Sequence, residues 1–69
     1  MMQHPAADAL LGRRVLDRAG QDLGVVVDVG TGELRAPKFL LVGAADTRML
    51  RVEARDVEAL DAPVLRVRN

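Results

Sequence analysis

The amino-acid sequence predicts an all-β fold, a small antiparallel β-barrel of five to six strands. From Gly12 onward, Gly, Pro, Asp and Thr interrupt the chain at short intervals, and runs rich in Val and Leu lie between them. This punctuation is typical of strands rather than helices. The later runs alternate apolar and charged residues, as expected of a sheet with one buried face. Five short runs joined by tight turns are typical of a small barrel or sandwich.

The first half of the chain is expected to hold a leader and two strands. Residues 1–10 are predicted to form a short flexible leader in front of a single domain at 11–69, with a turn of helix possible at 6–11. The first strand is predicted at 13–17. The second, at 23–29, is the clearest, because its β-branched valines suit a pleated and packed surface.

The second half is expected to hold three strands and a helical turn. Pro37 cannot donate to a strand ladder, so it marks an edge, a bulge or the start of the third strand, whose secure part is 38–42. A fourth strand is predicted at 47–53, a helical turn at 56–60 and a last strand at 64–68. By their spacing, the residues expected to share the inner side of these later elements are Leu50, Val52, Ala54, Val57, Leu60, Leu65 and Val67.

The composition argues against most enzyme chemistry. The chain has 69 residues, a formal net charge of zero and no Cys, Tyr or Ser, so it lacks the usual nucleophiles and the thiolates that bind zinc. We therefore expect no catalytic, cofactor-binding or metal site. A domain of this size buries little of its surface, and without a disulfide or metal it often relies on oligomerisation.

Two local patterns have a chemical and a structural interpretation. Gly30-x-Gly32 begins like a phosphate-binding loop, but Arg35 occupies the third glycine position and no amphipathic helix follows, which favours a hairpin turn. Asp17, Asp28 and Asp56 could serve in acid–base chemistry or calcium binding. Aspartates at strand ends more often accept backbone hydrogen bonds, and we favour that interpretation.

The first two predicted strands carry a pattern of glycine, aspartate and valine that resembles the opening of PRC-barrel domains. The residues that carry the resemblance are Gly12, Val15, Asp17, Gly20, Gly24, Val26 and Asp28. The run 39–42 also looks like the third strand of that family, and the similarity extends over about residues 11–68. The resemblance implies a small non-catalytic barrel that makes protein–protein contacts. The chain departs from the pattern by a shorter stretch between Asp28 and Phe39, by Pro37, and by valines at positions 25 and 27 that are commonly polar.

These valines predict an apolar patch on the outside of the domain. If Val26 packs inside, strand alternation turns its two neighbours outward, and the same alternation turns alternate residues of the third strand outward. The predicted patch consists of Val25, Val27, Phe39 and Leu41. An exposed patch of this kind usually marks an interface, here with a second copy or another protein. Alternatively, the leader folds over it with Leu10 and Leu11, or a bulge reverses the two faces.

The arginines offer a second candidate surface. Nine of the ten basic residues are arginines, and several follow the late strands. If these strands are adjacent, they form a basic stripe that binds RNA phosphates or an acidic partner. The candidate stripe consists of Arg48, Arg51, Arg66 and Arg68. The interspersed carboxylates and the zero net charge favour a solvated face of ion pairs instead.

Together these observations predict a non-enzymatic adaptor that self-associates, as a dimer, and contacts an unknown protein partner. No cofactor and no membrane span are expected, and nucleic acid is the less favoured ligand. The absence of a basic segment followed by an apolar stretch at the start predicts a cytoplasmic location. The alternative function is an RNA- or ribosome-associated module, because similar domains occur at the C-terminus of a ribosome-maturation factor.

Overall fold

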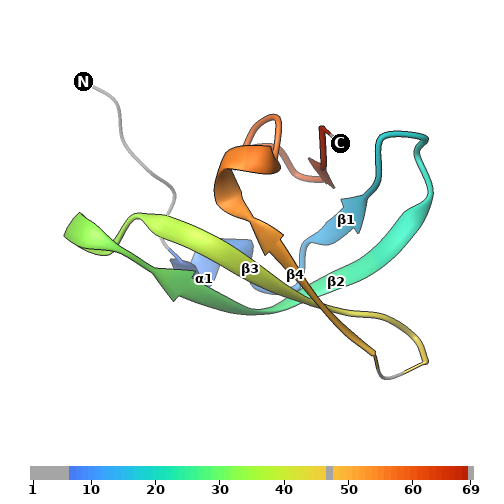
Figure 1. Ribbon diagram of the computed structural model, residues 1–69, viewed down its shortest axis with the longest axis horizontal. Helices are drawn as coiled ribbons and strands as arrows, with labels where there is room; N and C mark the ends of the chain where they lie inside the picture. Colours follow the sequence, from blue (N-terminus) through green and yellow to red (C-terminus); the bar gives the residue numbers. More distant parts are fainter. Residues whose placement is uncertain (1–6, 47, 69) are drawn as a thin grey trace.

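The chain folds into one five-stranded sheet with short helical turns (Figure 1). The structure is a computed structural model that describes residues 7–46 and 48–68. In chain order the elements are α1 (Ala7–Leu10), β1 (Arg14–Leu16), β2 (Asp22–Thr31), η1 (Glu33–Arg35), β3 (Pro37–Gly43), β4 (Met49–Glu53), η2 (Ala54–Asp56) and β5 (Leu65–Arg66). The all-β prediction is confirmed at this level, and each predicted strand corresponds to an observed one.

The sheet is mixed and open, so the prediction of a closed antiparallel barrel is wrong. The strand order is β4-β3-β2-β1-β5, and β5 runs parallel to β1. After β4 the chain does not turn back in a hairpin but crosses through η2 and a loop, which brings β5 to the far edge. One antiparallel bridge between Val57 and Val67 links the segment after β4 to the segment after β5. No ladder joins β4 to β5 among the described residues.

A bulge in β2 decides which of its residues face the core. Val26 lies opposite Val42, but the next pair along the ladder is Asp28 with Leu41, so Val27 is an extra residue in β2. The insertion shifts the alternation, and Val29 then packs against the core three residues after Val26. Pro37 is the first residue of β3, which is one of the positions that a proline can occupy in a sheet.

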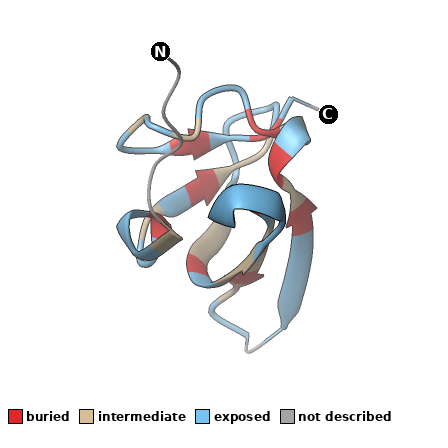
Figure 2. Ribbon diagram, turned by 90° about the vertical axis from the view of Figure 1, so that its left-hand side faces the viewer, coloured by how far each residue is buried: buried red, intermediate tan, exposed pale blue. Residues whose placement is uncertain are grey.

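The core lies on the concave side of the sheet (Figure 2). It is one cluster of buried aliphatic residues: Leu10, Val15, Val26, Leu40, Val42, Val52, Val57, Leu65 and Val67. Most of the residues expected to face inward on the later elements are in this cluster or packed against it. Ala54 is buried as well, whereas Leu50 is 44% exposed. No further strand of residues 7–46 and 48–68 lies beside β4 to cover this side chain.

The described end of the expected leader, residues 7–10, packs against the rest of the domain. Leu10, the last residue of α1, is fully buried in the core. The half-buried Arg13 holds this segment in place, because its Nε donates to the carbonyl of Ala9 at 2.9 Å and its Nη1 donates to the carbonyls of Leu60 and Ala62. Residues 1–6 of the expected leader lie outside the described residues.

The segment between β4 and β5 is held by backbone hydrogen bonds. The expected helical turn at 56–60 is instead the 3-10 turn η2, which begins two residues earlier. The amide of Glu58 donates to the carbonyl of Arg66 at 2.9 Å, and the amide of Arg68 donates to the carbonyl of Asp56 at 2.7 Å. Val57 is buried there as predicted. Among the described residues, no helix has the length and apolar character needed to cross a membrane.

Candidate interaction surface

The convex face of β2, β3 and β4 carries the four residues of the predicted patch. Val26, Leu40 and Val42 are buried on the inner face, and the residues that alternate with them lie on the other side. Val27 is 46% exposed, while Val25, Phe39 and Leu41 are half-buried. The structure thus brings Val25, Val27, Phe39 and Leu41 onto one outer face, with Val27 placed there by the bulge.

Met49, which was not among the predicted patch residues, extends this surface. Met49 lies opposite Gly43 in the β3–β4 ladder, and Val25 lies opposite Gly43 in the β2–β3 ladder. A Cβ atom at Gly43 would lie 3.1 Å from Val27 Cγ1 and 3.7 Å from Met49 Sδ, so the two side chains flank this glycine. Met49 is 58% exposed. We call Val25, Val27, Phe39, Leu41 and Met49 the outer patch.

Charged groups border the outer patch on β2 and β4. Asp28 and Arg51 lie on either side of Leu41 in the ladders. The guanidinium of Arg51 lies over the Phe39 ring, and its Nε donates to Glu53 Oε2 at 2.9 Å. This hydrogen bond, reinforced by the charges of Arg51, Arg55 and Lys38, holds the pKa of Glu53 below its ordinary value. The surface therefore combines an apolar centre with a polar rim, as protein interfaces commonly do.

The described part of the leader does not cover the outer patch through Leu10, because Leu10 packs into the inner core on the opposite side of the sheet. Leu11 is 46% exposed. The alternative required both leucines to cover the patch, and Leu10 does not do so. The bulge also does not reverse the faces as the other alternative required, because Val25 and Val27 stay off the inner face while Val26 is buried.

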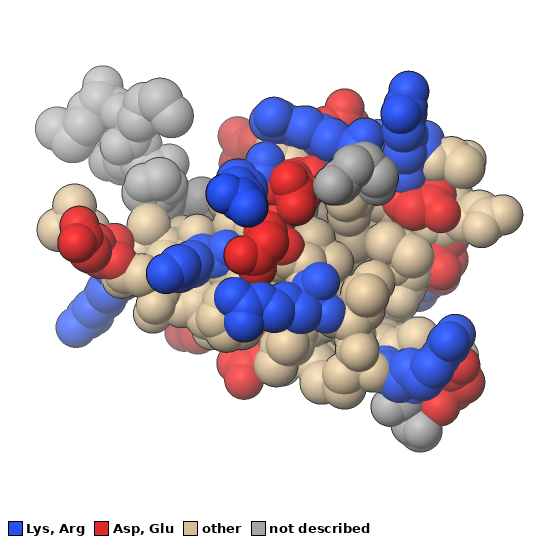
Figure 3. All heavy atoms as spheres, viewed as in Figure 1, with Lys and Arg blue, Asp and Glu red and all other residues tan. Residues whose placement is uncertain are grey.

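The four arginines of the candidate stripe do not lie on neighbouring strands, so that prediction is wrong. Arg48 and Arg51 belong to β4 and the residue before it, while Arg66 and Arg68 belong to β5 and its extension at the other edge of the sheet. Three of them pair with carboxylates: Arg48 with Asp46 at 2.6 Å, Arg51 with Glu53 at 2.9 Å and Arg66 with Glu58 at 4.0 Å. Figure 3 shows basic and acidic side chains interleaved over the visible face.

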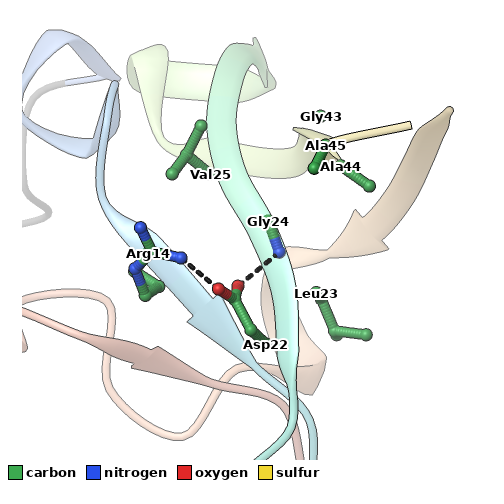
Figure 4. A pocket seen from close by; sticks show the side chains of 8 residues that line it. All are labelled: Arg14, Asp22, Leu23, Gly24, Val25, Gly43, Ala44 and Ala45. Atoms are coloured by element: carbon green, nitrogen blue, oxygen red, sulfur yellow. Dashed lines mark hydrogen bonds and ion pairs between the residues drawn. The ribbon is translucent and has the colours of Figure 1, made fainter. Parts of the chain in front are cut away.

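A shallow concavity of about 400 Å³ lies where β1, β2 and the end of β3 meet (Figure 4). Its wall includes Val25, so it adjoins the outer patch, and small residues at 43–45 form part of the lining. Arg14 and Asp22 form an ion pair at its side, and Asp22 Oδ1 also accepts the amide hydrogen of Gly24 at 2.8 Å. Its charged groups thus bond to each other or to the backbone, and it offers mainly small apolar side chains.

The residues that resemble the PRC-barrel pattern have structural roles. Val15 and Val26 are core residues. Asp17 Oδ1 accepts the amide hydrogen of Gln21 at 2.8 Å, and Asp28 Oδ1 accepts that of Val29 at 2.8 Å. Gly20 has a φ of 87° in the turn between β1 and β2, a conformation that favours glycine. Gly12 follows α1 and also has a positive φ, and Gly24 lies against the backbone of β3.

The other chemical interpretations find no assembled site in the described part of the chain. Gly30 lies near the end of β2, and the 3-10 turn η1 connects β2 to β3 in a hairpin. No group of three or more His, Cys, Asp or Glu side chains within residues 7–46 and 48–68 is arranged to hold a metal ion. In comparisons with known proteins, no family model matches the chain, and no curated protein matches it.

Proposed function

We propose that this protein is a non-enzymatic protein–protein interaction module of the PRC-barrel type that self-associates through the outer patch. The observation that carries the proposal is the cluster of apolar side chains on the convex face, opposite the core. Val27 and Met49 are 46% and 58% exposed there, although polar residues would suit a wet sheet face better. A second copy that covers this face supplies the burial that a single small sheet lacks.

The charged rim supports the same function. Asp28, Arg51 and Glu53 surround the apolar centre with both signs of charge, so a symmetric contact can place opposite charges against each other. Rim charges affect specificity and association rate more than affinity, while the apolar centre provides most of the affinity. The alternative RNA-associated function draws no support from the arginines, since they are split between two sheet edges and three of the four are paired.

Sedimentation of Val27→Asp tests the proposal. Val27 is exposed and unpaired at the bulge, so a charge there leaves the core intact but disfavours burial of the outer patch. We expect self-association at least about tenfold weaker than in the wild type, because burying an unpaired carboxylate costs more than about 1.4 kcal/mol. Val64→Asp is the matched control, because Val64 is 45% exposed and precedes β5 at the other edge. Equal association of Val27→Asp and wild type, or a monomeric wild type at micromolar concentration, would overturn the proposal.

A further inference from the structure

The two edges of the sheet differ in how they are covered. β5 has two residues, and the segment after η2 partly covers it through the Glu58–Arg66 hydrogen bond and the Val57–Val67 bridge. β4 has five residues that pair with β3 without any register shift. On its other side, β4 has no backbone partner among the described residues. Within the described part of the chain, β4 is therefore the open edge of the sheet.

β4 lacks most of the features by which proteins protect an open edge. Such edges usually carry a proline, a lysine or a bulge, and β4 has none of these. Met49 and Leu50, which point to opposite faces, are 58% and 44% exposed. Its two charges, Arg51 and Glu53, neutralise each other as an ion pair on one face. An unpaired, regular and partly apolar edge of this kind is a template for pairing with another strand.

The hydrogen-bonding phase of the ladder indicates which backbone groups are available. The amide of Ala44 donates to the carbonyl of Arg48 at 3.0 Å at the start of the β3–β4 hairpin. Hydrogen-bonded pairs recur at every second residue of an antiparallel ladder, so Leu50 and Val52 bond to β3. Met49, Arg51 and Glu53 then direct their N–H and C=O groups toward the open edge.

We propose that β4 pairs antiparallel with β4 of a second copy, around a two-fold axis at Val52. In a regular sheet, opposed residues share a face, so the axis can pass through Leu50, Arg51 or Val52. An axis at Arg51 places two arginines opposite each other, which is destabilising, and an axis at Leu50 forms no charge pair. An axis at Val52 places each Arg51 opposite Glu53 of the second copy. The same two residues then exchange backbone hydrogen bonds across the axis.

This contact is distinct from the outer patch and does not depend on it. Edge pairing joins the two sheets side by side and leaves the convex faces of both copies uncovered. A chain with both contacts forms assemblies larger than a dimer. Loss of either contact alone leaves dimers, and loss of both leaves monomers.

Charge exchange tests the edge contact. We would make Arg51→Glu and Glu53→Arg, each in the Val27→Asp background that weakens the outer patch. Each variant alone opposes like charges around the axis, whereas a mixture of the two restores both opposite-charge pairs. We expect the mixed pair to be about tenfold tighter than either homodimer, measured by sedimentation with one variant labelled. Arg66→Glu mixed with Glu58→Arg is the matched control, because these two charges form an exposed ion pair beside β5, at the other edge of the sheet, and their mixture should show no gain.

Amide hydrogen exchange of the wild type gives a second readout that a face contact does not produce. As protein concentration rises, exchange of the Arg51 and Glu53 amides should slow, because these groups become bonded across the axis. Exchange at Leu50 and Val52 should stay constant, since β3 already protects them. Unchanged exchange at Arg51 and Glu53, or a mixture no tighter than its components, would overturn the edge contact. A different result would separate the two proposals. If Val27→Asp associates like the wild type and the Arg51 and Glu53 amides become protected, the proposed function is overturned and the edge contact is supported.

Discussion

The guanidinium of Arg51 on β4 lies 4.0 Å from the centroid of the Phe39 ring on the neighbouring strand β3. The contact places a cation over the ring of the chain's single Phe, on the outer face of the sheet, and the sequence has no Tyr or Trp. It also limits how much of this ring a partner meets directly. Glu53, which lies opposite Phe39 in the ladder, accepts a hydrogen bond from the same guanidinium and fixes its position.

A double-mutant cycle between these two residues measures their interaction. Arg51→Ala removes the cation, and Phe39→Leu keeps an apolar side chain but removes the ring. We expect a coupling of about 0.5–1 kcal/mol in the free energy of unfolding, which is typical of an exposed cation–π pair. Denaturant unfolding at low protein concentration provides the measurement, so that association does not contribute. Strictly additive single changes would show that the ring and the guanidinium do not interact.

The ion pair with Arg51 predicts an unusually acidic Glu53. Its pKa lies below the ordinary value of 4.5, first because Arg51 donates a hydrogen bond to it and then because of the nearby charges. A lowered pKa in the folded state means that the ionised form stabilises the fold at pH values above 4.5, and this stabilisation is lost as the pH falls through the lower folded value. An NMR titration of the Glu53 side chain measures the pKa directly, and Arg51→Gln should raise it. A Glu53 pKa at or above 4.5 in the wild type would contradict the prediction.

Local patterns predicted most of the strand residues that face the core, with Leu50 as the exception. Val26, Leu40, Val42 and Leu65 are all buried as the alternation required, because the period of two is a property of the strand itself. The bulge at Val27 preserved the prediction for the outer patch, although its position was not predicted. The position of Pro37 at the start of β3 is one of the three alternatives that its missing donor allowed.

The topology could not be predicted in this way, since it depends on the path of residues 54–64. No local pattern places β5 parallel to β1, and with β5 at the far edge the basic stripe separates into two groups. The exposure of Met49 and Leu50 was not predicted for the same reason, because it follows from the position of β4 at an open edge. A five-stranded sheet has many possible orders, and only tertiary contacts select one.

Burial of Leu10 predicts that the first described helix is needed for stability. Leu10→Ala should lower the free energy of unfolding by about 2–5 kcal/mol, because it removes a fully buried side chain and leaves a cavity. Leu11→Ala is the matched control, and its effect should be small since Leu11 is 46% exposed. Thermal or denaturant unfolding of both variants makes the comparison. Equal free energies of unfolding for the two variants would contradict this prediction, and the segment would then be a leader that contributes little to stability.

The close approach of β2 and β3 at Gly24 makes this position intolerant of any side chain. Gly24 has a φ of 124°, and a Cβ atom there would lie 2.2 Å from the carbonyl oxygen of Gly43. Backbone on both sides of the contact leaves no flexible side chain to move away. Gly24→Ala therefore combines an unfavourable φ with a backbone clash, and we expect a loss of more than about 3 kcal/mol, enough to unfold a marginal domain.

Gly20→Ala separates the two causes. Gly20 also has a positive φ, 87°, but nothing lies within 4 Å of a Cβ atom placed there. This change should cost only the conformational penalty of about 1–2 kcal/mol and leave the fold intact. Circular dichroism and denaturant unfolding of the two variants measure the difference. If Gly24→Ala were as stable as Gly20→Ala, the two strands would have to separate at Gly24 and Gly43 at little cost, and the concavity beside them would widen.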